Sequence, residues 1–413
     1  MIKQLYLENW KSFHQSTLFI DPLTILIGTN ASGKSNVLDA LFFLHKSTQG
    51  ISLGSILDGD AESTGMRGGS KWAIAKGQRY STLRLVVDGG QFDYEYEITL
   101  ESLGENKLEI KSEHLRQYTR RKRSAPIIKS LFSTSEIPSH SPSLTAYFNT
   151  NTQGRGKKLE FRRSISILSQ CRSLSLAKHV QRGIEAVHKA LGQVFILEPI
   201  PSQMRAFAKL SDRLLPDGSN VAGVLAALPK ERQLEVEDVL TGFLSQLPEK
   251  DIQRVWAEPV GKFQSDAMLY CSEKWALGHM DTFEMDARGM SDGTLRFLAI
   301  MTALLTMPEG SLLVVEEIDN GLHPSRAHVL VKFLKEQGQK RHIDVLCTTH
   351  NPALLDALGN EMIVFMSAVY REPATGWSKI SLLEDIDTLP RLIAQGSIGK
   401  LSTSGALEES LVG

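Results

Sequence analysis

The stretch Gly28-Thr-Asn-Ala-Ser-Gly33-Lys34-Ser35 decides the fold of this 413-residue chain. It fits the phosphate-loop pattern, in which two glycines, a lysine and a hydroxyl residue stand at fixed spacing. Residues 23–27 before it form an apolar run of strand length, and residues 36–44 after it have apolar side chains at helical spacing. A glycine-rich loop between a strand and a helix is the context that the pattern requires, so we expect an α/β nucleotide-binding fold.

The residue types in this loop suit phosphate binding. The glycines let the backbone turn its N–H groups toward phosphate oxygens, and the helix that follows adds partial positive charge at its N-terminus. Lys34 is expected to reach the β- and γ-phosphates of ATP, and Ser35 is expected to bind Mg²⁺. The predicted nucleotide-binding residues of the loop are Gly28, Asn30, Ser32, Gly33, Lys34 and Ser35.

Two later strand patterns deliver polar side chains of a complementary kind. Residues 311–315 form an apolar run that ends in Glu316 and Glu317, and residues 342–347 form another that leads to His350. Strands of a parallel sheet end at one edge, where ligands bind in open α/β folds. There Glu316 is expected to orient Mg²⁺, Glu317 to polarise the attacking water, and His350 to sense the γ-phosphate. The competing interpretation is that all three are ordinary polar residues at strand ends.

Four stretches of the sequence together resemble a known family. They are Leu5-Tyr-Leu-Glu-Asn-Trp10-Lys11-Ser12-Phe13, the phosphate loop, Met290-Ser291-Asp292-Gly293-Thr294-Leu295-Arg296, and Glu316-Glu-Ile-Asp319-Asn320-Gly321-Leu322-His323-Pro324 followed by His350-Asn351-Pro352. As a set they are similar to the ABC-type ATPases of the chromosome-maintenance and DNA-repair branch. More narrowly, the chain resembles the AAA-family ATPases related to the overcoming-lysogenization-defect proteins of bacterial defence systems.

The resemblance implies a fold and a mechanism. The fold is an α/β P-loop NTPase with an ABC-type ATPase head, an antiparallel β subdomain and a mainly helical insertion lobe. In this family the signature motif of one subunit contacts the γ-phosphate bound by another. Ser291 and Gly293 are therefore expected to act in trans, within a head-to-tail homodimer or a higher homo-oligomer. Lys11 and Phe13 are expected near the adenine.

Some positions depart from the family pattern. Glu316 stands where the usual residue is an aspartate, and Leu322-His323-Pro324 replaces the D-loop aspartate of transporters. The family's glutamine loop has two candidates, Gln49 and Gln78, without a deciding feature. Arg67-Gly68-Gly69 is either a partial substitute for that loop or a surface turn.

We expect four segments along the chain. Residues 1–115 form the first half of the ATPase head, 116–265 the insertion, 266–370 the second half with the signature, the Walker B carboxylates and the histidine switch, and 371–413 the C-terminal strands and tail. Alternation of apolar and polar residues predicts antiparallel strands at 80–87, 92–100 and 107–110. A Ser/Pro-rich loop is predicted at 130–143, helices at about 165–193, 218–228 and 231–247, and edge strands at 361–367 and 377–383.

Composition limits the classes of partner. The net charge of −1 gives no bulk attraction for nucleic acid. A local basic cluster, Arg120 to Arg123 with Lys157, Lys158, Arg162 and Arg163, is either a binding site for DNA or RNA phosphates or a solvated loop. Three scattered cysteines suggest no disulfide framework. With no signal peptide and no apolar run of membrane-spanning length, we expect a cytoplasmic protein without a membrane domain.

Three functions remain open at this point. The first is a nucleotide-dependent dimerisation switch that controls a partner effector, such as a nuclease or toxin, or a DNA transaction, in bacterial anti-phage defence. The second is a repair or recombination ATPase that acts directly on DNA. The third is the ATPase subunit of a membrane transporter, which the Glu316-Glu317 pair and the large insertion disfavour. We find no nuclease signature after the ATPase motifs, so any cleaving activity is expected from a partner.

Overall fold

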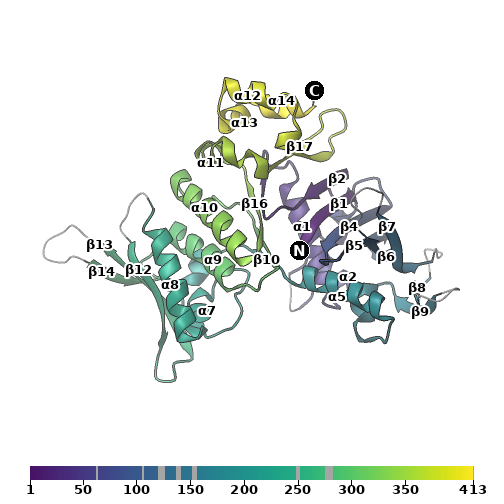
Figure 1. Ribbon diagram of the computed structural model, residues 1–413, viewed down its shortest axis with the longest axis horizontal. Coiled ribbons are helices and arrows are strands. Elements are labelled where there is room, and N and C mark those ends of the chain that lie inside the picture. The colour runs from purple at the N-terminus through teal and green to yellow at the C-terminus, as the bar shows by residue number, and fades with distance from the viewer. Residues whose placement is uncertain are drawn as a thin grey trace.

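One sheet of fourteen strands joins a parallel half to an antiparallel half (Figure 1). The computed structural model describes residues 1–61, 64–104, 107–119, 126–135, 141–150, 156–247, 252–274 and 282–412. The strand order is β10-β15-β16-β3-β17-β18-β2-β1-β4-β5-β6-β7-β8-β9. The parallel strands are β10 (Val194–Leu197), β15 (Leu312–Val315), β16 (Asp344–Thr349), β3 (Leu23–Ile27) and β17 (Met366–Arg371).

Side chains of the parallel strands alternate between two apolar cores, one on each face of the sheet. Ile25 and Ile27 of β3 belong to the core that includes α9 (Asp292–Thr306) and α10 (Pro324–Arg341). Leu26 belongs to the opposite core, which includes α1 (Lys34–Ser47). Because both faces are covered, all five residues of β3 are buried, and the strand reads as a nearly continuous apolar run.

This topology brings distant parts of the chain to one edge of the sheet. The carboxyl end of β3 leads into the phosphate loop at Gly28, and that of β15 leads into Glu316. The carboxyl end of β16 leads into His350, and β17 ends at Arg371. Since the four strands are parallel, these residues share the edge at which ligands bind in open α/β sheets.

The antiparallel half confirms the strands predicted from alternation. Residues 80–87 and 92–100 lie in β4 and β5, and residues 108–110 begin β6. Helix α5 (Lys178–Gly192) covers one face of this half and buries Val180, Ile184 and Val187. The antiparallel strands are β2 (Phe13–Phe19), β1 (Ile2–Trp10), β4 (Tyr80–Asp88), β5 (Phe92–Ser102), β6 (Leu108–Thr119), β7 (Ile127–Thr134), β8 (Ser143–Phe148) and β9 (Lys157–Arg162).

The strand predicted at 377–383 is confirmed, but the prediction that the C-terminal strands lie at an edge of the sheet was wrong. Residues 360–365 form the 3-10 helix η2 (Asn360–Phe365), and β17 and β18 (Ser378–Leu382) lie in the middle of the sheet. β17 is parallel to β3, β18 is antiparallel to β17, and β18 is parallel to β2. This hairpin is therefore the junction between the two halves of the sheet.

The insertion contains the expected helices but also supplies strands to both sheets. Residues 130–134, predicted as part of a loop, lie in β7, because Leu131 and Phe132 are fully buried in the core under α5. A second sheet holds β11 (Ala208–Lys209), β13 (Asp266–Lys274), β12 (Ile252–Val260) and β14 (Thr282–Asp286). Its helical cover is α7 (Val221–Ala227) and α8 (Lys230–Leu244).

Short elements complete the fold. The C-terminal helices gather beyond β17 at one end of the molecule (Figure 1). Among the described residues, no helix is both long and apolar enough to span a membrane. These elements are α2 (Leu53–Asp58), α3 (Gly69–Ala73), α4 (Ile167–Gln170), η1 (Cys171–Ser173), α6 (Pro201–Met204), α11 (Pro352–Leu358), η3 (Leu383–Asp385), α12 (Leu389–Gln395), α13 (Ile398–Ser404) and α14 (Ala406–Val412).

A buried carboxylate fastens the start of α4 to the antiparallel half. Glu113 on β6 is fully buried and accepts hydrogen bonds from the backbone N–H groups of Ile167 and Leu168, each at 2.7 Å. The hydroxyls of Tyr96 and Ser166 donate to the same carboxylate at 2.9 and 3.0 Å. Burial raises the pKa of Glu113 from 4.5 to about 7, although these donors favour the charged form.

We predict that Glu113→Gln changes how stability depends on pH. A carboxyl with a raised pKa in the folded state stabilises the fold below its unfolded pKa of 4.5 and loses that contribution as the pH rises toward about 7. Wild-type protein should therefore lose about 2–3 kcal/mol of unfolding free energy relative to the variant between about pH 5 and pH 8. Urea unfolding at both pH values measures this. The exposed Glu160→Gln on β9 is the control; equal pH dependence in both variants contradicts the prediction.

Candidate nucleotide-binding site

Both glycines of the phosphate loop have backbone conformations that other residues avoid. Their φ angles are 147° at Gly28 and 121° at Gly33. A Cβ atom on Gly28 would lie 2.1 Å from the carbonyl oxygen of Val369, and one on Gly33 would lie 2.7 Å from Ser378 Oγ. The loop therefore depends on both glycines for its turn and for its close approach to β17 and β18.

Lys34 begins α1 and turns its ammonium group back over the loop. Nζ donates to the carbonyl oxygens of Gly28 and Thr29 at 2.6 and 2.9 Å. Burial lowers the pKa of Lys34, while the charges of Glu317 and Glu316 act in the opposite direction. Both hydrogen-bond partners are neutral, so the cation is available to an anionic ligand.

Glu316 contacts the phosphate loop and Arg67 at the same time. Ser35 Oγ donates to the Glu316 carboxylate, which lies across the sheet edge from it. Arg67 Nη1 lies 3.0 and 2.9 Å from the two oxygens of the same carboxylate. Arg67 therefore contributes its side chain to the site, although the Arg67-Gly68-Gly69 turn itself lies at the surface. That this turn replaces part of the glutamine loop stays a prediction.

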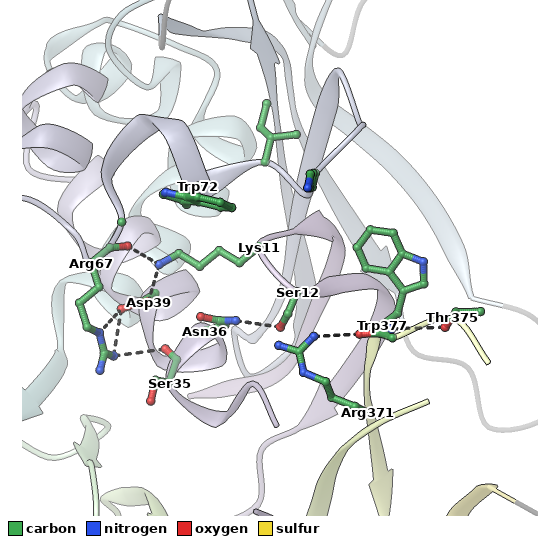
Figure 2. Close-up of a pocket in the computed structure, with 14 residues that line it drawn as sticks. Lys11, Ser12, Ser35, Asn36, Asp39, Arg67, Trp72, Arg371, Thr375 and Trp377 are labelled. Atoms are coloured by element: carbon green, nitrogen blue, oxygen red, sulfur yellow. Dashed lines mark hydrogen bonds and ion pairs between the residues drawn. The ribbon is translucent and has the colours of Figure 1, made fainter. Parts of the chain in front are cut away.

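The contacts of Arg67 continue to Asp39 and Lys11 (Figure 2). Arg67 Nε and Nη2 lie 3.1 and 3.0 Å from Asp39 Oδ1, and Lys11 Nζ lies 2.6 Å from Asp39 Oδ2. Burial opposes the charge on Arg67, but Asp39 and Glu316 outweigh it and raise its pKa. Burial lowers the pKa of Lys11, against the attraction of Asp39. The result is a continuous chain of alternating charges from β1 to β15.

Glu317 and His350 face each other at the same edge. His350 Nδ1 lies 3.6 Å from Glu317 Oε1, and both side chains are partly exposed. Glu317 has a φ of 49°, a conformation that non-glycine residues rarely adopt. Its N–H donates to Thr348 Oγ1 at 2.9 Å, and its carbonyl accepts from Asn320 at 2.9 Å. Neighbouring strands thus hold Glu317 in a strained conformation, as is common at functional positions.

Two adjoining cavities surround these groups. The smaller, of about 300 Å³, is lined by Asn30, Lys34, Ser35, Glu316 and Glu317 among others. The larger, of about 510 Å³, extends from Ser35 and Asp39 past Lys11. Figure 2 shows Trp72 above the Lys11 side chain and Trp377 on the other side of this cavity. A polar compartment beside a wider one with aromatic walls fits a triphosphate joined to a nucleoside.

The signature residues lie on a different element and line neither cavity. Ser291 caps α9, and its side chain accepts from the N–H of Thr294 at 3.1 Å. It is exposed, whereas Gly293 is buried, and a Cβ on Gly293 would lie 2.9 Å from the carbonyl oxygen of Gly321. An exposed helix N-terminus apart from both cavities is compatible with a role in trans.

Three predicted residues occupy places that differ from the expectation. Phe13 is fully buried behind the loop and lines neither cavity, so its contribution is packing under Gly33. Ser32 is also buried, with only 2 % of its surface exposed. Arg163, predicted in the basic cluster, is 1 % exposed and pairs with Glu101 and Glu109, so it is a structural ion pair.

The structure describes only some of the remaining residues of the basic cluster. Lys157, Lys158 and Arg162 lie exposed on β9 at the far edge of the antiparallel half. Arg120 to Arg123 lie outside the described residues. Neither glutamine candidate, Gln49 or Gln78, lines the cavities.

Other residues of the site were missed by the sequence reasoning. Asp39 lies on the second turn of α1, where its spacing from Ser35 was the available signal. Arg371 Nε donates to the carbonyl oxygen of Ala31 at 2.9 Å, and Ser378 Oγ donates to that of Ser32 at 2.5 Å. Nothing in the sequence links these two residues to the loop, because more than 300 residues separate them from it.

The donor set fits Mg²⁺ as well as a nucleotide. Ser35 Oγ and the Glu316 carboxylate converge on one point, and hydroxyl and carboxylate oxygens are ligands that Mg²⁺ accepts. Lys34 lines the same cavity and supplies a cation suited to a phosphate. The residues present therefore match the groups that the phosphate loop implies.

Comparisons with known proteins agree with this geometry. Residues 23–356 match the family described as "AAA domain, putative AbiEii toxin, Type IV TA system". No curated protein matches the chain. Among solved structures, an SmcHead bound to the C-winged helix domain of ScpA is similar with a TM-score of 0.52 and 13 % identity, over 92 % of this chain and 96 % of that one.

A second similar structure is the Smc head domain with an extended coiled coil bound to the C-terminal domain of ScpA, derived from Pyrococcus furiosus. Its TM-score is 0.49 with 11 % identity, over 95 % of this chain and 99 % of that one. At these identities the structural likeness concerns the fold alone. The chain belongs to the family of AAA domains described as putative AbiEii toxins of type IV TA systems, and it has the P-loop fold of SMC heads.

Proposed function

We propose that this chain binds and hydrolyses ATP with Mg²⁺, and that the nucleotide drives head-to-tail association of two copies. The observation that carries the proposal is the convergence of Lys34, the Ser35–Glu316 pair and Glu317 on one cavity of about 300 Å³. His350 does not line this cavity, but its Nδ1 lies 3.6 Å from Glu317 Oε1. Each group matches a need of phosphoryl transfer, which rests mainly on positioning and charge neutralisation. The assignment of the chain to an ABC-type AAA ATPase fold rests on the family and structure comparisons, and it does not depend on the proposed hydrolysis or association.

The position of each side chain indicates its role in the proposed reaction. Lys34 and the N-terminus of α1 bind the phosphates, and Ser35 with Glu316 holds Mg²⁺, which supplies further neutralising charge. Glu317 stands beyond Glu316 as the base that orients the attacking water, and His350 contacts Glu317 and holds its carboxylate toward the cavity. Lys11 and Trp72 border the compartment for the nucleoside.

The proposed association of two copies rests on the position of Ser291, which lies outside both cavities of its own subunit. Ser291 is exposed at the start of an apolar helix of 15 residues, apart from both cavities of its own subunit. The N-terminus of such a helix stabilises an anion, and a γ-phosphate held by another copy is the anion that this arrangement suits. Hydrolysis then removes the charge that holds the copies together, which makes the assembly a nucleotide-dependent switch.

We further propose that this switch controls a partner effector, such as a nuclease or toxin, in a bacterial anti-phage system, inside the cytoplasm. The family match supports this role, since its description refers to a toxin of a TA system. Direct action on DNA is the weaker candidate. Arg163 is engaged in buried ion pairs, and the exposed Lys157, Lys158 and Arg162 lie on β9, at the far end of the sheet from the nucleotide site.

Lys34→Ala is expected to weaken Mg-ATP binding by about 100-fold or more. The phosphates lose charge-assisted hydrogen bonds, which contribute about 1.5–3 kcal/mol each. Isothermal titration calorimetry measures the affinity. Lys332→Ala removes an exposed lysine on α10 as the control and should bind normally. Retained tight binding by Lys34→Ala would contradict the phosphate-loop assignment.

Glu317→Gln is expected to keep Mg-ATP bound and to slow hydrolysis by about 100-fold or more, because a neutral amide cannot act as the base. Phosphate release measures the rate, and light scattering after gel filtration measures the solution mass. ATP should raise the mass of this variant to that of an assembly. An unchanged mass with ATP bound would rule out nucleotide-driven association.

Ser291→Arg is expected to bind Mg-ATP normally and to lose turnover, because the arginine blocks the contact with the second copy. Mixing it in equal amounts with Lys34→Ala tests action in trans. Half of the dimers then have one intact composite site, so about a quarter of wild-type turnover should return. No recovery on mixing, with both variants folded and able to associate, would show that Ser291 does not act across subunits.

A further inference from the structure

The segment between β10 and α7 packs against the signature helix α9. We call it the 198–220 loop. The N–H of Ile200 donates to the carbonyl oxygen of Asp217 at 2.8 Å and closes the loop on itself. Helix α6 lies in this loop and contacts α9. A Cβ atom on Gly218 would lie 3.2 Å from Ala299 Cβ of α9, so the loop fits closely on the helix. Close packing of this kind fixes the loop relative to α9.

Arg205 extends from the end of α6 to the residues on either side of Ser291. Its Nη2 donates to the carbonyl oxygen of Met290 at 2.9 Å and to Asp292 Oδ1 at 2.6 Å. The preceding side chain, Met204, is 4 % exposed and holds α6 in the apolar core that includes α9. One guanidinium nitrogen therefore joins both neighbours of Ser291, through hydrogen bonds that a charged donor makes stronger than neutral ones.

These contacts bear on the backbone conformation of Ser291. The backbone there is extended, with φ −66° and ψ 153°, and Ser291 Oγ accepts from the N–H of Thr294 at 3.1 Å. An N-cap residue needs this extended backbone so that its side chain reaches the first turn of the helix. Because Arg205 contacts the residue before Ser291 and the residue after it, the guanidinium restrains the backbone at this position.

The charge of Asp292 gives the ion pair a second consequence. The carboxylate stands in the first turn of α9, next to Ser291, and 67 % of its side-chain surface is exposed. An unpaired carboxylate there would repel a phosphate that approaches the same turn. Arg205 pairs with it and offsets that charge. An ion pair this exposed contributes little to the stability of a fold, so stability does not account for it.

We propose that Arg205 is a positioning residue of the signature: it holds Ser291 in the conformation that meets the γ-phosphate of a second copy, and it offsets the charge of Asp292 there. The inference rests on the proposed action of Ser291 in trans. Arg205 lines neither cavity of its own subunit, so its effect falls on turnover and not on nucleotide binding. The 198–220 loop, within the insertion, is then the element through which one copy sets the turnover of the other.

Arg205→Ala should lower kcat by about tenfold or more while KM and the Mg-ATP affinity change by less than about twofold, because a displaced group costs rate and not binding. Phosphate release and isothermal titration calorimetry measure these quantities. Arg205→Lys keeps a cation beside Asp292 and should recover part of the turnover. Arg213→Ala removes an exposed arginine from the same loop and should match wild type. Wild-type turnover in Arg205→Ala, or an equal loss of nucleotide affinity, would overturn the proposal.

Asp292→Asn separates the charge effect from a general loss of structure. Without the carboxylate there is no charge to offset, so Arg205→Ala should cost only about threefold in turnover in this background. The same cost in both backgrounds would contradict the role given to the ion pair. Arg205→Gln, which also removes the charge, replaces Arg205→Ala in this cycle if the alanine variant does not fold.

Mixing experiments assign the defect to the signature side. Equal amounts of Arg205→Ala and Lys34→Ala should restore about a quarter of wild-type turnover, because half of the dimers then combine an intact phosphate loop with an intact signature. Arg205→Ala mixed with Ser291→Arg should show no turnover beyond the residual rate of Arg205→Ala. If Lys34→Ala complements Ser291→Arg but not Arg205→Ala, this inference fails alone. If it complements neither, the proposed action in trans fails as well.

Hydrogen exchange tests the restraint on the signature directly. In Arg205→Ala, the amides of residues 290–296 should exchange faster than in wild type, because the hydrogen bond from Thr294 to Ser291 is no longer held in place. Exchange in residues 23–35, which contain β3 and the phosphate loop, should stay unchanged. Faster exchange in both regions, or in neither, would show that Arg205 does not position the signature.

Discussion

The carboxylate of Glu316 is the contact on which the site depends. It meets Ser35 from the first half of the chain and Arg67 from the segment after α1, although 281 and 249 residues separate it from them. Removing it would leave Arg67 paired with Asp39 but without the second carboxylate that neutralises it. Charged groups of this kind persist at a half-buried site only when each has a partner or a ligand. Glu316 can therefore bind a cation only if its ion pair with Arg67 becomes weaker.

A second set of contacts joins the phosphate loop to the middle of the sheet. The β17–β18 hairpin joins the parallel and antiparallel halves, and its ends hydrogen-bond to the loop that would bind phosphate. Close packing allows no side chain at Gly28 or Gly33, so the loop cannot move independently of the hairpin. The phosphate loop and the C-terminal end of the sheet are thereby joined by contiguous packing and hydrogen bonds.

The fold class and the principal motifs could be predicted from the sequence because each rests on a local pattern. Residues 23–27 are apolar throughout, as a strand buried on both faces must be, and the glycine loop follows directly. The alternation of apolar and polar residues in β4 and β5 likewise predicted these two strands correctly. The edge-strand and loop predictions failed because tertiary burial overrode local composition: Ser130, Phe132 and Ser133 pair with β6, and Leu131 and Phe132 enter the core.

The sequence by itself determined that a glycine-rich loop and a pair of carboxylates follow strands whose ends meet at one edge, and it predicts that these residues carry phosphate and Mg²⁺ chemistry. Only the tertiary structure decided that Arg67 bridges Asp39 and Glu316, that Phe13 is buried packing, and that Ser378 supports the loop. The physical reason is range: periodicity and turn chemistry act over a few residues, whereas strand order in the sheet brings together side chains hundreds of residues apart.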